Sequence, residues 1–147
     1  MYTEEKEFVE KVVQVNRVAK KTKGGNRIAF SVLTVVGDKK GQVGVGLGRA
    51  LDVSSAVKKG INRAQKYLLK VPLKGTTIPH AVRTKLGAAE VLLKPAPAGT
   101  GIKAGGAVRA VLEVAGIRDV VAKILGSENK ASNVYATMKA LGELKEQ

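Results

Sequence analysis

The chain has 147 residues, enough for one medium domain or two small ones, and carries 26 Lys and Arg against 12 Asp and Glu, a net charge of +14. Such an imbalance concerns partners and not fold, and it favours a polyanion, of which nucleic acid is the commonest. The absence of cysteine excludes disulfides, thiolate metal sites and cysteine nucleophiles, and suits a reducing cytosol. Because aromatic residues make up only 3% of the chain, the core must be aliphatic.

The positive charge is concentrated in the first half. Residues 11–74 hold 15 Lys and Arg but only two acids, Asp38 and Asp52. The acidic start, MYTEEKEF, resembles neither a secretory signal nor a transit peptide. The most apolar stretch, residues 104–116, is interrupted by Arg109 and Glu113, which argues against a membrane span. We therefore expect the first half to face the polyanion, with no membrane contact.

In chain order, the first half predicts three strands and a helix. The valine-rich residues 10–19 and the apolar residues 28–36 are typical strands, joined by a charged turn at residues 20–27, KKTKGGNR. A second turn at residues 37–41 leads to a third strand at residues 42–48. A helix is expected from Val53 to about Lys70, with Asp52 as its N-cap.

The third strand and this helix form a pair with two distinct surfaces. Glycine at every second position (Gly44, Gly46 and Gly48) leaves one face of the strand bare, which indicates a close approach to its backbone. The helix has an apolar stripe made of Val53, Val57, Ile61, Ala64 and Leu68. Its opposite face carries Lys59, Arg63, Lys66 and Lys70. The pattern predicts a helix that packs on the sheet and turns its cations outward, toward phosphate.

The second half predicts a further mixture of strands and helices. Pro72 and Gly75 follow the first helix, and we place a domain boundary there, giving residues 1–75 and 76–147. A hairpin is expected from residues 76–86 and 88–95, and a strand from residues 120–125.

Two helices accompany these strands. One spans residues 107–115, opened by Gly105 and Gly106 and ended by Gly116 as C-cap. Ser132 or Asn133 is expected to cap the last helix. The predicted fold class is α+β, with an N-terminal β-β-β-α unit followed by a C-terminal domain of split βαβ type.

Nothing in the sequence predicts catalysis, a metal or a cofactor. The single histidine, His80, has no nearby nucleophile or orienting partner, and one histidine without cysteine makes a zinc site implausible. The acids are scattered, and their only clusters lie at the chain ends, where solvation is the ordinary state. No phosphate-binding GxxxxGK[ST] motif occurs.

Two loops carry alternative interpretations. GTGIKAGG, residues 99–106, precedes a helix N-terminus and is either an anion cradle or a tight turn that lets the helix pack. The KKTKGGNR loop is either solvated or in contact with phosphate, and the basic helix in the same unit favours phosphate. Because aromatic residues are few, recognition of folded, double-stranded RNA by backbone and shape fits better than base stacking.

Two long strings resemble a known family. VNRVAKKTKGGNRIAFSVLTVVGDKKGQVGVGLGRALDV, followed by PAPAGTGIKAGGAVRAVLEVAGIRDVVAKILGS, is similar to bacterial-type small-ribosomal-subunit protein five, from about Glu10 to about Leu141. The resemblance implies an N-terminal domain like double-stranded-RNA-binding domains and a C-terminal domain shared with galactokinase-like kinases and elongation-factor domains. It also implies a structural protein of the cytoplasmic ribosome that affects assembly and decoding accuracy.

The resemblance further implies partners. Gly46, Gly48 and Arg49 would approach small-subunit ribosomal RNA, while Gly99, Gly101 and Arg109 would face ribosomal protein four. Ribosomal protein eight would be a neighbour of the C-terminal domain, and messenger RNA would pass nearby where it enters the subunit.

Sequence pattern and resemblance together give one set of expected RNA contacts: Arg17, Lys20, Lys21, Lys23, Gly24, Gly25, Asn26, Arg27, Gly46, Gly48, Arg49, Lys59 and Arg63. Two rival functions remain open from the sequence. One is a truncated small-molecule kinase that uses GTGIKAGG for ATP, and the other is a duplex-RNA chaperone acting off the ribosome.

Overall fold

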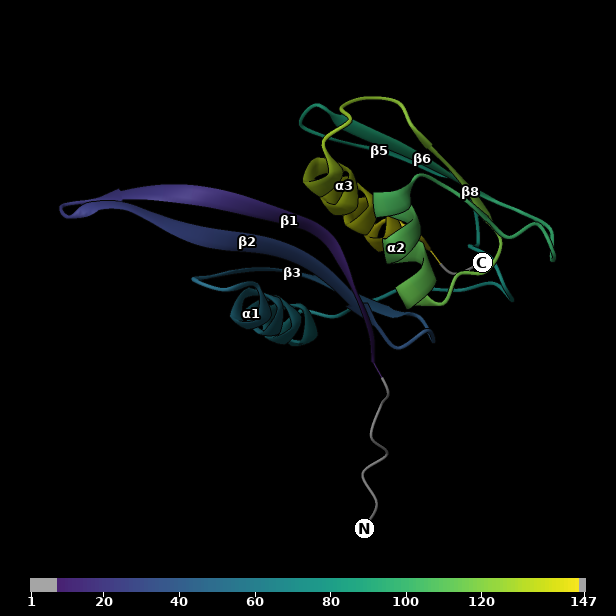
Figure 1. The fold of residues 1–147 in the computed structure, drawn as a ribbon. Helices are drawn as coiled ribbons and strands as arrows, with labels where there is room; N and C mark the ends of the chain where they lie inside the picture. Colours follow the sequence, from purple (N-terminus) through teal and green to yellow (C-terminus); the bar gives the residue numbers. More distant parts are fainter. Residues whose placement is uncertain (1–7, 146–147) are drawn as a thin grey trace, which may run out of the picture.

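The computed structural model describes residues 8–145, apart from the side chains of residues 20–22 and 26. Two four-stranded sheets enclose α2 and α3, and α1 covers the outer face of the first sheet (Figure 1). The elements in chain order are β1 (Val9–Thr22), β2 (Gly25–Gly37), β3 (Gln42–Ala50), α1 (Val53–Lys66), β4 (Leu69–Lys70), β5 (Val82–Leu86), β6 (Ala89–Pro95), β7 (Ile102–Lys103), α2 (Gly106–Ala115), β8 (Val120–Ile124) and α3 (Lys130–Gly142).

The first sheet is antiparallel, with the order β1-β2-β3-β4. Helix α1 ends at Lys66 and not near Lys70, because Leu69 and Lys70 pair with Val43 and Gln42 as β4. The predicted β-β-β-α order holds for β1 to α1.

The second sheet has the order β5-β6-β8-β7, in which β7 and β8 are parallel and the other pairs antiparallel. Helix α2 connects β7 to β8, so these three elements form a βαβ unit. The two parallel strands are direct neighbours in the sheet. Residues 76–81, predicted as strand, precede β5 without joining it. The α+β class is confirmed.

Helix ends follow local side-chain chemistry. Asp52 caps α1, where its Oδ2 accepts from the Ser55 amide at 3.0 Å, and Gly116 ends α2 with φ 93°, both as predicted. The cap predicted for α3 is wrong, because Asn129 Oδ1 accepts from the Ser132 amide at 3.2 Å. The helix therefore begins before Asn133, whose buried side chain instead donates to the Ser127 carbonyl.

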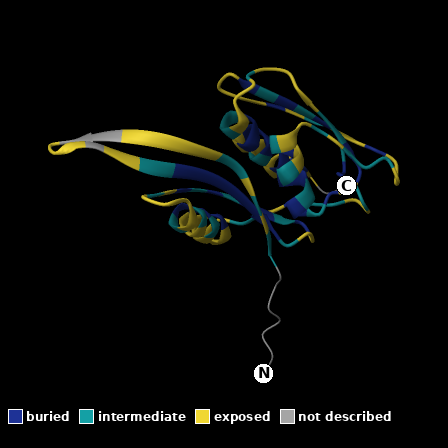
Figure 2. Ribbon diagram, in the orientation of Figure 1, coloured by how far each residue is buried: buried dark blue, intermediate teal, exposed yellow. Residues whose placement is uncertain are grey.

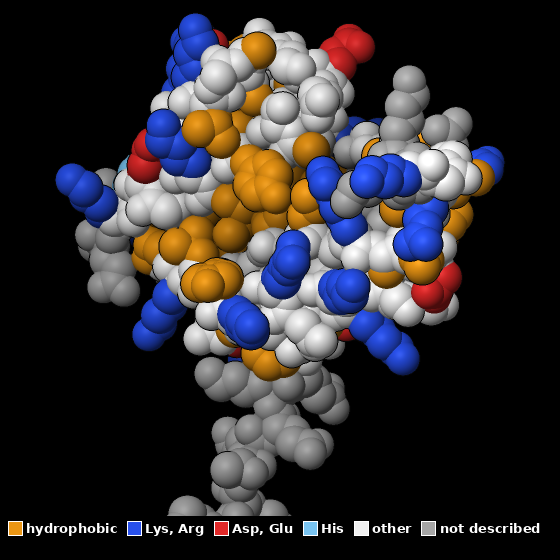
Figure 3. Space-filling view, turned by 90° about the vertical axis from the view of Figure 1, so that its left-hand side faces the viewer, with side chains coloured by type: hydrophobic (Ala, Val, Ile, Leu, Met, Phe, Trp, Pro, Cys, Tyr) orange, Lys and Arg blue, Asp and Glu red, His pale blue; other side chains and the backbone are white. Residues whose placement is uncertain are grey.

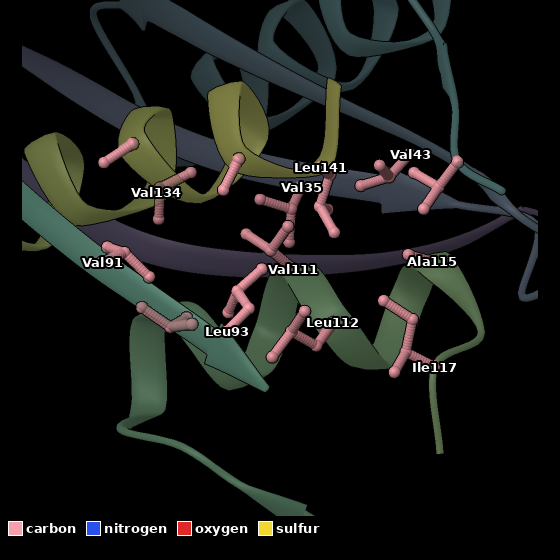
Figure 4. Packing of buried hydrophobic residues seen from close by; sticks show 14 of the residues in the cluster. Val35, Val43, Val91, Leu93, Val111, Leu112, Ala115, Ile117, Val134 and Leu141 are labelled. Atoms are coloured by element: carbon pink, nitrogen blue, oxygen red, sulfur yellow. The ribbon is translucent and has the colours of Figure 1, made fainter. Parts of the chain in front are cut away.

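One aliphatic core lies between the two sheets (Figure 4). Val35 and Val43 from the first sheet meet Leu112 and Leu141 from α2 and α3, and Leu93 closes the cluster from the second sheet. The two halves on either side of Gly75 therefore contribute to one shared hydrophobic core, while the boundary at Gly75 stays a prediction. No helix among the described residues is long and apolar enough to cross a membrane.

Candidate nucleic-acid interface

The β1–β2 hairpin projects beyond the rest of the first sheet (Figure 1). Strand β3 ends at Ala50, opposite Phe30, whereas the pairing of β1 with β2 continues to Thr22 and Gly25. The predicted turn at residues 20–27 is thus mostly strand, and only residues 23 and 24 form the turn. The extended register places basic residues along a narrow two-stranded ribbon, whose outer part is largely exposed (Figure 2).

The hairpin presents several of the expected RNA contacts. Arg17, Lys23 and Arg27 are exposed, and Lys20 pairs with Arg27 across the two strands. Gly24 lies in the turn, and Gly25, with φ 127°, begins β2 directly after it; both glycines are exposed. The side chains of Lys20, Lys21 and Asn26 lie outside what the structure describes. The ribbon therefore presents exposed cations at and near the hairpin tip, away from the hydrophobic core.

The glycine face of β3 is not open to RNA, and the expectation for Gly46 and Gly48 is wrong on this point. Helix α1 lies directly on that face. A Cβ at Gly46 would meet the Gly60 carbonyl oxygen at 1.9 Å, and one at Gly48 would meet the Ala56 carbonyl oxygen at 2.0 Å. The close approach that the glycines permit is therefore made by the protein's own helix.

Small residues on α1 match these glycines. Its buried positions are Ala56, Gly60 and Ala64, spaced four apart. Of the apolar stripe that we predicted, only Ala64 is among them. Four helical residues rise about 6 Å, and two strand residues rise about 6.6 Å. Each small residue of α1 therefore lies opposite one glycine of β3. Thr34 Oγ1 donates to the Gly46 carbonyl at 3.1 Å and fills the remaining space beside Gly60. The alternating glycines of the strand and the small residues at four-residue spacing in the helix could therefore have predicted from the sequence that α1 packs on β3.

Because its small face is buried, α1 turns its cations outward beside the free edge of β3. We call Arg49, Lys59 and Arg63 the cation row. Lys59 Nζ donates to the Arg49 carbonyl at 3.2 Å, and Arg63 Nη1 donates to the Leu47 carbonyl at 2.9 Å. An ammonium has three donors and a guanidinium five, so each side chain is anchored with donors to spare.

Figure 3 views the molecule from the side toward which the hairpin points. Lys and Arg side chains are spread over that face, and acidic side chains are few. Arg49, Lys59 and Arg63 are exposed, and none of the ion pairs between described residues includes them or Arg17, Lys23 and Arg27. These charges are left for an external anion.

In the second half, a buried carboxylate shapes the 97–101 loop. Asp119 is 4% exposed, and its Oδ1 accepts from the amides of Gly99 at 3.1 Å and Gly101 at 2.8 Å. A hydrogen bond from the Thr76 side chain, with those from the backbone amides, holds the pKa of Asp119 below its ordinary value. Gly99 and Gly101 have φ of 94° and 80°, which favour glycine. Sequence reasoning missed Asp119, which lies 18 residues from the loop it holds.

Arg109 lies on α2 in an ion-pair cluster that joins the two halves. Glu113 accepts from Arg109 Nε at 2.8 Å and also pairs with Lys11 of β1. Lys11, and then Arg109, hold the pKa of Glu113 below its ordinary value. The Arg109 side chain is still half-exposed, so it has surface left for a partner.

This geometry disfavours catalysis. The amides of Gly99 and Gly101, which a phosphate cradle would need, already donate to Asp119. His80 accepts at Nε2 from the Lys145 amide at 3.0 Å, and its Nδ1 lies 2.9 Å from the Ala81 carbonyl. Because the backbone engages both ring nitrogens, the role of His80 is structural. Within residues 8–145, no group of His, Cys, Asp and Glu side chains could hold a metal ion.

Comparison with known proteins identifies the family. Residues 8–72 match ribosomal protein S5, N-terminal domain, and residues 84–147 match ribosomal protein S5, C-terminal domain. Small ribosomal subunit protein uS5 of Treponema pallidum strain Nichols is 53% identical over 140 residues, covering 95% of this chain and 81% of the relative. The same values hold for the uS5 protein of a second strain, of Treponema pallidum subsp. pallidum. The chain therefore belongs to the ribosomal protein S5 family, whose members are structural and not enzymatic components of the small subunit of the cytoplasmic ribosome.

Proposed function

We propose that the protein binds small-subunit ribosomal RNA through residues 1–75 and docks on neighbouring ribosomal proteins through residues 76–147. The observation that carries the RNA contact is the set of exposed cations without acidic partners on the hairpin and the cation row. Each cation that meets a phosphate releases condensed counterions, which drives binding without reading sequence.

The hairpin and the cation row would act as two separate contacts. The ribbon places Arg17, Lys20, Lys21, Lys23 and Arg27 along a narrow two-stranded support, with Gly24, Gly25 and Asn26 at or beside its tip. Such a ribbon reaches phosphates that a flat surface cannot. Lys59 and Arg63 of the cation row are anchored to backbone carbonyls, so their positions are fixed before RNA arrives and less side-chain entropy is lost on binding.

The 97–101 loop and Arg109 would contact ribosomal protein four and, through that contact, influence decoding accuracy. Gly99 is exposed and Gly101 half-buried, and Asp119 holds both in one conformation. Ribosomal protein eight is the proposed second neighbour of residues 76–147, and messenger RNA at the region where it enters the subunit is a further proposed partner.

The first experiment tests the integral ribosomal role. Tagged protein from a cell lysate is sedimented through a gradient, with and without a high-salt wash. We expect it to migrate with the small subunit. Migration in the free fraction at low salt would contradict the proposal and favour a chaperone acting off the ribosome.

A second experiment tests the phosphate contacts. The affinity for small-subunit ribosomal RNA is measured over a range of salt concentrations. If six cations contact phosphate, the affinity should fall about a thousandfold between about 50 and 200 mM salt. The slope of the logarithm of affinity against the logarithm of salt concentration counts these contacts. Changing Arg49, Lys59 and Arg63 to Gln should reduce the size of this slope by about three.

The matched control removes the same charge from the second half. Lys94, Lys103 and Lys123 are exposed there, and their change to Gln should leave the slope nearly unaltered. Equal losses in both triple variants would mean that net charge and not the cation row drives binding.

A further inference from the structure

Tyr67 is unusually exposed for an aromatic residue in this chain. It is the C-cap of α1 and is 79% exposed, the largest value among the large apolar side chains that the structure describes. The chain has only three Tyr, two Phe and no Trp. A ring that could have joined the aliphatic core is instead held at the end of a basic helix.

Its position extends the cation row. Tyr67 follows Arg63 by four residues and Lys59 by eight, so the three lie on one side of α1. Lys59 and Arg63 are fixed to the carbonyls of Arg49 and Leu47 at the free edge of β3. Tyr67 therefore lies about one helical turn beyond Arg63 and about two turns beyond Lys59.

We propose that Tyr67 stacks on an unpaired RNA base while the neighbouring cations hold the phosphates beside it. This inference rests on the proposed RNA binding and adds a specific feature of the RNA. Inside a duplex the face of every base is covered by its neighbours, so an aromatic ring can stack only on a bulged or terminal base. The recognised RNA is thus a duplex with an unstacked base next to the phosphates that the cation row neutralises.

Electrostatics and stacking can be separated by their response to salt. A cation adds to the salt slope because it displaces counterions, whereas an aromatic ring adds affinity without changing the slope. Tyr67 should therefore discriminate between two RNAs of equal charge density, and Arg63 should not.

The experiment compares two hairpin RNAs that differ only in one unpaired adenosine within the stem. We expect the full chain to prefer the bulged RNA about tenfold, near the low end of what stacking of one base on an aromatic side chain contributes. Tyr67→Ala should abolish the preference, and Tyr67→Phe should keep it because the ring remains. Arg63→Gln should weaken both complexes equally and reduce the salt slope by about one.

Leu51 provides a matched control. It is 68% exposed, precedes the N-cap of the same helix and has no ring, so Leu51→Ala should leave the preference unchanged. An equal loss in Leu51→Ala and Tyr67→Ala would show that general apolar contact, and not stacking, causes the preference, and would overturn the inference.

Tyrosine fluorescence gives an independent readout, because no Trp obscures it. In a protein with Tyr2→Phe and Tyr135→Phe, Tyr67 is the remaining tyrosine. Its emission should be quenched by the bulged RNA and much less by the perfect duplex.

The possible failures can be told apart. A bulge preference that survives Tyr67→Ala, or equal quenching by both RNAs, overturns the role of Tyr67. Salt-dependent binding of both RNAs without any preference overturns it too, but leaves the proposed RNA binding intact. Weak, salt-independent binding of both RNAs refutes the proposed function itself.

Discussion

Gly46 is the position where a single methyl group should do most damage to the first half. A Cβ there would lie 1.9 Å from the Gly60 carbonyl oxygen and 2.7 Å from the Ala64 amide nitrogen, where ordinary contacts begin at 3.4 Å. Both neighbours are backbone atoms, so no rotamer change can relieve the clash. In Gly46→Ala, α1 must move away from β3 by about 1.5 Å at this point.

Such a displacement opens the contacts on either side. Ala56 and Ala64 would lose their close packing on Gly48 and Gly44, and a gap of only about 1 Å already forfeits up to half of the dispersion energy of each atom pair. Overpacking of a filled core costs about 1–3 kcal/mol, and backbone on both sides puts this site at the upper end. We therefore expect Gly46→Ala to lower the free energy of unfolding by about 3 kcal/mol.

Urea unfolding followed by circular dichroism measures this loss, with Gly106→Ala as the matched control. Gly106 begins α2, has an ordinary φ, and a Cβ there would meet nothing within 4 Å. Both variants restrict the unfolded chain alike, so their difference isolates the clash in the folded protein. If the two variants unfold within about 0.5 kcal/mol of each other, the packing argument for α1 on β3 is refuted.

Three further predictions concern the second half. The pKa of Glu113 is lowered from 4.5 by Lys11 and then Arg109, so its ion pairs stabilise the fold above the unfolded-state value and cease to do so as pH falls through the lowered one. Glu113→Gln should therefore destabilise the protein by at most about 1 kcal/mol at neutral pH, and urea unfolding in acid, where the difference should shrink, checks the sign. Asp119→Ala removes the acceptor of the 97–101 loop, so hydrogen–deuterium exchange should accelerate in that loop and little elsewhere; unchanged exchange would contradict the role of Asp119. Gly101→Ala strains a residue with φ of 80°, and we expect weaker capture by immobilised ribosomal protein four with unchanged RNA affinity, whereas equal capture would argue against a loop contact.

Much of the local structure could be predicted because its signals lie within a few residues. The valine-rich strands, the Asp52 cap and the Gly116 cap depend on alternation or on contacts between near neighbours. The short strands β4 and β7 could not be predicted in this way, because two residues carry no periodicity and are extended only by pairing with a distant strand.

Some features of the candidate site could likewise be predicted from the sequence, and others depend on contacts between distant residues. Composition and the charge of residues 11–74 were enough to predict a polyanion partner and the cations that would face it. Asp119 and the Lys11–Glu113 pair could not be predicted, because each joins residues that only the folded chain brings together.

The sequence by itself determined the α+β class, the aliphatic core and the excess of cations in the first half, since all three follow from residue types and short-range spacing. Tertiary structure alone decided how the glycine strand is used. Alternating glycines indicate that something lies close to the strand but do not identify what it is. In the folded protein the small residues of α1 cover that face of β3 and leave no room there for RNA. The same packing turns Lys59 and Arg63 to the edge of β3 and leaves Tyr67 exposed beside them, because a helix that buries one face must expose the other.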